Sequence, residues 1–174
     1  MFFGVLIKPT KKQHKMDPKL KTYAITASCA ANSSKTAIVA KNSINVPIIT
    51  LGGTAGNEEG AGMTPLEASL GTLVACQAST ARYIAGKILN IKIGAISFPV
   101  VEGTLDLNGF YTGSVPSHFN KVNVVCEVET AESKETIAKL FELVEKQCPL
   151  HSLMHAAHVE MNFSWSIKEP ASKL

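Results

Sequence analysis

Four cysteines carry the most reactive side chains in this sequence: Cys29, Cys76, Cys126 and Cys148. A thiolate is a nucleophile, and two thiols that come together can form a disulfide. Cys76 lies in a segment with a helical pattern. Steps of three or four residues place four side chains with hydroxyl groups on its side of that helix: Ser69, Thr72, Thr80 and Tyr83. The thiol of Cys76 therefore occupies the most polar side of an apolar helix, where both a reactive thiol and a small core residue are open interpretations.

Cys148 precedes a proline, which predicts that it is the N-cap of a short helix. Free backbone N–H groups and the helix dipole stabilise a thiolate at that position. Cys148 also extends the apolar stripe of Val144 by one turn, so it could equally complete a core face. Cys29 and Cys126 fall in predicted strands, and Glu127 beside Cys126 opposes formation of a thiolate. We expect both to be core residues.

A metal site is the alternative for the segment after Cys148, because Cys148, His151 and His155 are spaced at i, i+3 and i+7 and His158 follows. Ligands on one short helix crowd a single side of an ion, and no second cysteine pair has zinc-finger spacing. We therefore expect no metal and no cofactor. Either His151 modulates Cys148, or the three histidines form a polar helix surface.

The helix that carries Cys76 has a clear start. Thr64 followed by Pro65 and, three residues on, Glu67 predicts a capping box with proline at the first helical position. The helix is expected to end at about Leu89. Its residues are apolar or small nearly all round, as is typical of a helix enclosed by protein.

The elements around this helix predict an α+β fold with a mainly antiparallel sheet. Extended or alternating segments lie at residues 22–50, 91–106, 121–129 and 159–166. The segment at 22–50 favours two or three short strands in a meander. A turn-rich stretch covers 108–120, a second helix is expected at 132–147 with one apolar face, and a short third helix follows Cys148.

Length and charge limit the function. At 174 residues with 45% hydrophobic content, the chain can bury one core, and we expect one domain at 21–168 between a flexible extension at 1–20 and a tail at 169–174. A net charge of only +3 argues against nucleic acid as a partner. No apolar run approaches the length of a membrane span. Four cysteines without an export signal favour a reducing, cytoplasmic location, with organellar targeting by the first residues left open.

Two segments resemble the superfamily of osmotically inducible protein C and organic hydroperoxide resistance proteins. Residues 64–76 are similar to its central-helix cysteine motif, and Gln147-Cys148-Pro149-Leu150 is similar to its second motif. Residues 105–110 and 115–119 add to the likeness, which spans about 21–168 and is closer to the less characterised branch. The resemblance implies an intertwined homodimer in which two long central helices are wrapped by mainly antiparallel sheets from both chains.

The same resemblance implies the roles of the thiols. Cys76 would attack an organic hydroperoxide and become a sulfenic acid, and Cys148 would resolve it as a disulfide that a dithiol reductant reopens. The function implied is thiol-dependent reduction of organic hydroperoxides in oxidative stress defence, without a cofactor. The alternative is a non-catalytic protein of the same fold that binds an apolar small molecule at the dimer interface.

The chain departs from the hydroperoxide-resistance branch around the thiol. In that branch an arginine held by a glutamate activates the cysteine, whereas the only arginine here is Arg82, inside the helix. The position directly after the motif proline is a leucine, and Glu67 lies one step further on. Glu67 and His151 are therefore the candidate modulators, and Lys35 or Lys41 could supply a positive charge.

Overall fold

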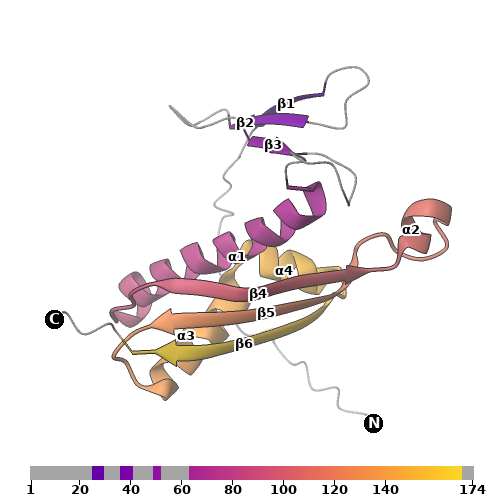
Figure 1. Cartoon of the computed structure of the whole chain (residues 1–174). Helices are drawn as coiled ribbons and strands as arrows, with labels where there is room; N and C mark the ends of the chain where they lie inside the picture. The colour runs from indigo at the N-terminus through magenta and orange to yellow at the C-terminus, as the bar shows by residue number, and fades with distance from the viewer. Residues whose placement is uncertain (1–24, 30–35, 41–48, 52–62, 170–174) are drawn as a thin grey trace, which may run out of the picture.

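The computed structural model describes residues 25–29, 36–40, 49–51 and 63–169, which form two three-stranded sheets and a set of helices (Figure 1). The elements, in chain order, are β1 (Ile25–Cys29), β2 (Thr36–Ala40), β3 (Ile49–Leu51), α1 (Pro65–Ile84), a π-helical turn η1 (Ala85–Leu89), β4 (Ile96–Leu105), α2 (Leu107–Thr112), β5 (Phe119–Glu129), α3 (Lys134–Gln147), α4 (Pro149–Ala156) and β6 (Glu160–Lys168). The predicted order of strands, central helix, strands, two helices and strand is confirmed. The predicted extension at 1–20 lies outside the described residues, as do Lys35 and Lys41.

Most of the strand pairs are antiparallel, as predicted, but one pair is parallel. Strands β1, β2 and β3 form the predicted meander, and β4 pairs antiparallel with β5. Strand β6, however, pairs parallel with β5, from Lys121 opposite Glu160 to Glu129 opposite Lys168. A parallel pair needs a long crossover, which α3 and α4 supply. The second sheet is therefore mixed.

The core lies between the mixed sheet and the helices α1, α3 and α4, which cover one of its faces (Figure 1). Every second residue of β5 is buried: Val122, Val124, Cys126 and Val128. The predicted apolar stripe of α3 is also buried: Ile137, Leu140, Phe141 and Val144. Phe141 stacks on Trp165 of β6 with ring centroids 5.4 Å apart. Both periodicities thus point toward the same interior.

Helix α1 begins as predicted. The backbone N–H of Glu67 donates to Thr64 Oγ1 at 3.2 Å, and the Thr64 N–H donates to Glu67 Oε2 at 2.8 Å, which closes the capping box. The helix ends at the predicted place but not as a regular α-helix, because it passes into η1 and stops at Asn90, whose φ of 52° is left-handed. Within the described residues no helix is both long and apolar enough to cross a membrane.

One side of α1 is open in the single chain. Its inward side is buried at Leu73, Gln77, Ala81 and Ile84. On the other side, small or polar residues are exposed: Gly71, Thr72, Ala75 and Ser79. The prediction that protein encloses this helix all round is therefore not met by one chain.

Helix α2 was not predicted. The structure forms it inside the stretch expected to be turns: Asp106 caps its start by accepting from the Asn108 N–H at 2.8 Å, and Gly113 ends it with a left-handed φ of 66°. Gly109 is required there, because a Cβ atom would lie 2.6 Å from the Pro116 carbonyl oxygen. The helix exposes two aromatic side chains, Phe110 and Tyr111.

Candidate active site

The structure brings Cys76 and Cys148 together, one from the middle of α1 and one from the junction of α3 and α4. Both are free thiols; Cys76 is half-buried and Cys148 is fully buried. Cys76 packs against the core cluster that contains Cys148, and it is close enough to raise the pKa of the Cys148 thiol through a hydrogen bond and through its charge. The pair therefore consists of one accessible thiol and one hidden thiol.

Cys148 is held in place by two helices. Its N–H donates to the Val144 carbonyl at 2.8 Å, which makes it the C-cap of α3, and it is also the N-cap of α4 as predicted. Burial is the main influence on its pKa and raises it, whereas the backbone N–H groups of His151 and Leu150 lower it. The net shift is upward, so Cys148 is a neutral thiol at neutral pH. The N–H groups at the start of α4 lower the pKa of Cys148 as expected, but burial raises it by more.

A buried polar pair lies beside the two thiols. Gln77 Nε2 and His151 Nδ1 are 3.3 Å apart, and both side chains are almost fully buried, at 2% and 7% exposure. Burial lowers the pKa of His151, Glu145 opposes this and His155 adds to it. The imidazole is therefore neutral, and with Nδ1 as acceptor for the Gln77 amide it carries its hydrogen on Nε2.

The other side-chain atom of Gln77 has no partner. Gln77 Oε1 is buried without a hydrogen bond from any residue that the structure describes. Leaving a buried acceptor unsatisfied costs about 1–3 kcal/mol. We did not predict Gln77 from the sequence, although a single amide in the buried stripe of α1, between Leu73 and Ala81, is the signal that could have indicated it.

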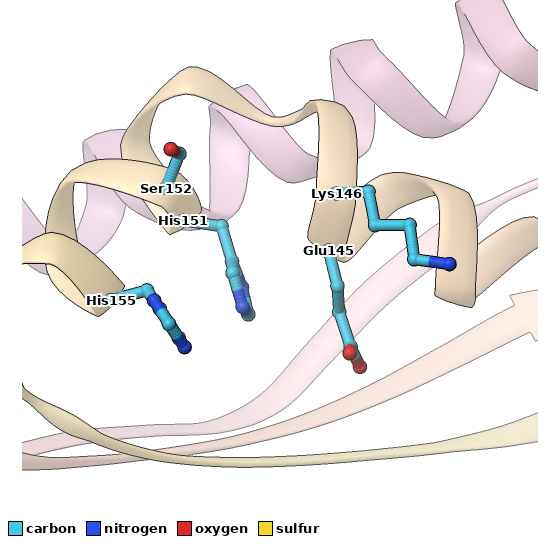
Figure 2. A pocket seen from close by; sticks show the side chains of 5 residues that line it. All are labelled: Glu145, Lys146, His151, Ser152 and His155. Carbon is cyan, nitrogen blue, oxygen red and sulfur yellow. The ribbon is translucent and has the colours of Figure 1, made fainter. Parts of the chain in front are cut away.

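His151, which contacts Gln77, also lines a pocket of about 330 Å³. Its lining residues come from the end of α3 and from α4: Glu145, Lys146, His151, Ser152 and His155 (Figure 2). The imidazoles of His151 and His155 and the carboxylate of Glu145 extend to the same side, away from the Ser152 hydroxyl. His151 thus lies between this pocket and Gln77.

The histidines do not assemble the alternative metal site. Across the described residues no group of three or more His, Cys, Asp or Glu side chains is placed to hold a metal ion. Two of the candidate ligands have other partners, because the Cys148 thiol interacts with Cys76 and His151 pairs with Gln77. His158 follows the end of α4 with a left-handed φ of 58°.

Glu67, a predicted modulator, is engaged at the helix start. Its carboxylate accepts from the N–H and the hydroxyl of Thr64, both at 2.8 Å, and these bonds lower its pKa. It precedes Cys76 by nine residues, about 13 Å along the helix axis. A modulating role for Glu67 stays a prediction.

Cys126 is a core residue, as predicted. It is fully buried in β5, and burial, with a smaller contribution from the charge of Glu127, raises its pKa to about 12. Its thiol is therefore inert in the folded chain. Cys29 lies in β1 opposite Thr36, and the burial predicted for its side chain lies outside what the structure describes.

The comparisons with known proteins identify the family and the fold. Residues 56–164, which include both Cys76 and Cys148, match the family model of OsmC-like protein. The hydroperoxide reductase of Mycoplasma genitalium is 26% identical over 109 residues, which cover 62% of this chain and 73% of that protein.

Solved structures share the fold. The OsmC-like protein of Mycoplasma pneumoniae has a TM-score of 0.69 at 26% identity and covers 84% of this chain and 97% of its own. The organic hydroperoxide resistance protein OhrB of Bacillus subtilis has a TM-score of 0.53 at 18% identity, with coverages of 85% and 98%, which shows likeness of fold. With more than half of its length matched by the family model, this chain belongs to the OsmC-like protein family.

Proposed function

We propose that this chain is a thiol-dependent reductase of organic hydroperoxides that contributes to oxidative stress defence, with Cys76 as the peroxidatic thiol and Cys148 as the resolving thiol. The observation that carries the proposal is the contact between a half-buried and a fully buried free thiol. The names of relatives support the same chemistry, since one is a hydroperoxide reductase and another an organic hydroperoxide resistance protein.

The reaction can be written with its atoms balanced. The Cys76 thiolate attacks one oxygen of the hydroperoxide, so an S–O bond forms, the O–O bond breaks, and the leaving alkoxide takes a proton to become an alcohol. The Cys148 thiol then attacks the sulfenic sulfur of Cys76. An S–S bond forms, and the hydroxyl group leaves with the thiol proton as water. An external dithiol reduces this disulfide and is itself oxidised to a disulfide.

The difference in exposure supports this division of roles. A hydroperoxide can reach the partly accessible Cys76, while Cys148 has no exposed surface. The raised pKa of Cys148 also keeps it protonated before the reaction. Cys148 is therefore protected from direct oxidation and reacts with the neighbouring Cys76 instead.

We also propose that the protein acts as a homodimer in the cytoplasm. The open side of α1 carries Gly71, Thr72, Ala75 and Ser79, whose small side chains allow the helix of a second copy to approach closely. Light scattering after size exclusion measures the mass; a monomer at micromolar concentration would contradict this part of the proposal.

The test of activity uses cumene hydroperoxide with dithiothreitol. The parent protein should consume peroxide over many turnovers, and Cys76→Ser should abolish consumption. In the absence of dithiothreitol, Cys148→Ser should form the sulfenic acid once but no intramolecular disulfide. Cys126→Ala, at a thiol that burial makes inert, is the matched control and should turn over like the parent. Equal turnover by Cys76→Ser would end the proposal, and stoichiometric capture of an apolar ligand without peroxide consumption would favour the non-catalytic alternative.

A further inference from the structure

The buried pair of Gln77 and His151 has a particular relation to the two thiols. Gln77 directly follows Cys76 on α1, and His151 is the third residue of α4, whose N-cap is Cys148. The contact between Gln77 Nε2 and His151 Nδ1 thus joins the same two helices that present the sulfur atoms. It connects residues that are 74 positions apart in the sequence.

Stability alone does not account for this pair. Both side chains are almost fully buried, and Gln77 Oε1 remains without a partner in the described part of the chain. Replacing both partners of such a pair by apolar residues is often neutral or stabilising. A leucine at each position would fill the same core without an unsatisfied oxygen.

Apolar contacts also hold the two helices together around the thiols, and these contacts are not directional. Cys76 and Leu150 pack on the cluster that contains Ala81, Val144 and Cys148. Such contacts tolerate small shifts of one helix along another, whereas a hydrogen bond fixes distance and orientation. A disulfide requires a narrow range of Cβ separations and of the torsion about its S–S bond.

We propose that Gln77 and His151 are positioning residues, whose hydrogen bond fixes α4 against α1 so that Cys148 meets Cys76 in the geometry that a disulfide needs. This inference rests on the pairing of the two thiols in the proposed function. Neither residue touches the peroxide in this scheme. They act through the register of the two helices.

The test measures the pairing of the thiols directly, without peroxide. Cys29→Ser and Cys126→Ala form the background, so that only Cys76 and Cys148 remain. The folded protein is equilibrated in glutathione redox buffers, quenched by alkylation, and the fraction of Cys76–Cys148 disulfide is read by mass spectrometry. Three variants are compared with this background: Gln77→Leu, His151→Leu and the double variant that carries both substitutions.

The double leucine variant should lower the equilibrium constant for disulfide formation by about 10- to 100-fold, because a disulfide formed in a distorted geometry stores strain and is more easily reduced. Its free energy of unfolding in urea should be equal to or higher than that of the parent. His151→Asn is the conservative variant, because its Oδ1 takes nearly the place of histidine Nδ1 and can accept from Gln77; it should restore most of the constant. Ser152→Ala, the exposed neighbour on α4, is the matched control and should not change it.

The outcomes separate the two proposals. If the double leucine variant pairs its thiols within about twofold of the parent, or if the constant falls only in proportion to a loss of folding stability, the positioning role is overturned. A parent that forms the disulfide but consumes no hydroperoxide refutes the proposed function, while the fall in the leucine variant still supports the positioning role. A parent that never pairs these thiols overturns both.

Discussion

The reactivity of Cys126 can be predicted quantitatively. Burial, and to a smaller extent the charge of Glu127, raises the pKa of this thiol to about 12. At pH 8 a thiol with that pKa is ionised to about one part in 10⁴, whereas an unperturbed thiol with a pKa of about 8.5 is ionised to about one quarter. The thiolate is the reactive species. We therefore expect Cys126 in the folded chain to react with iodoacetamide at least about 2,000-fold more slowly than in the unfolded chain.

The assay follows each thiol separately. The reduced Cys29→Ser protein is treated with iodoacetamide at pH 8 for increasing times, quenched, digested and analysed by mass spectrometry, and the same protein in urea gives the unfolded reference. Cys76, which is half-buried, should be labelled first in the folded protein. Cys148 should follow slowly, because it has no exposed surface and its pKa is raised. Cys126 should remain unlabelled the longest.

One result would refute this reasoning. Labelling of Cys126 in the folded chain within about tenfold of the rate in urea would mean that β5 does not bury it, because a stable domain unfolds too rarely to explain such a rate. Glu127→Gln is the matched variant. It removes the smaller cause of the shift and leaves the burial, so it should raise the rate only slightly.

Three further predictions concern stability. Leu140→Ala, at a fully buried position of α3, should lower the free energy of unfolding in urea by about 2–5 kcal/mol, whereas Glu142→Ala on the exposed side should change it by less than about 0.5 kcal/mol; similar values would contradict the assigned core face. Thr64→Ala, which removes the hydroxyl of the capping box, should cost about 1 kcal/mol, and no loss in the same measurement would contradict the cap. Because burial lowers the pKa of His151, the unfolded chain binds the extra proton first as pH falls below about 6.5. The parent should therefore lose more stability than His151→Asn between about pH 7.5 and pH 5, and an equal loss would show that His151 is not responsible.

Periodicity predicted the parts of the fold that depend on which face is buried. The alternation of β5 and the apolar stripe of α3 were confirmed because a two-layer core leaves each element only one face to bury. The parallel pairing of β6 with β5 could not be predicted in this way, since alternation is the same for a parallel and an antiparallel neighbour. Helix α2 was missed because Gly109 and Gly113 indicate turns, and the need for Gly109 arises from a contact with Pro116 that sequence spacing does not contain.

The site was predictable to the extent that local chemistry defines it. The proline after Cys148 correctly predicted an N-cap, with backbone N–H groups that favour a thiolate. The stronger effect, burial, depends on packing against α1, more than seventy positions away, and no local pattern could provide its size. Gln77 was missed for the same reason, because its role depends on a contact with His151, which is distant in the sequence.

The arrangement of the thiols also affects when Cys148 can ionise. The charge of Cys76 raises the pKa of Cys148, so while Cys76 is a thiolate its neighbour holds its proton. In the reaction we propose, oxidation carries Cys76 into the neutral sulfenic acid, and that opposing charge disappears. The backbone N–H groups of His151 and Leu150, which favour the Cys148 thiolate, then act without that opposing charge. Cys148 thus becomes easier to ionise only after Cys76 has reacted, which is the order that resolution as a disulfide requires.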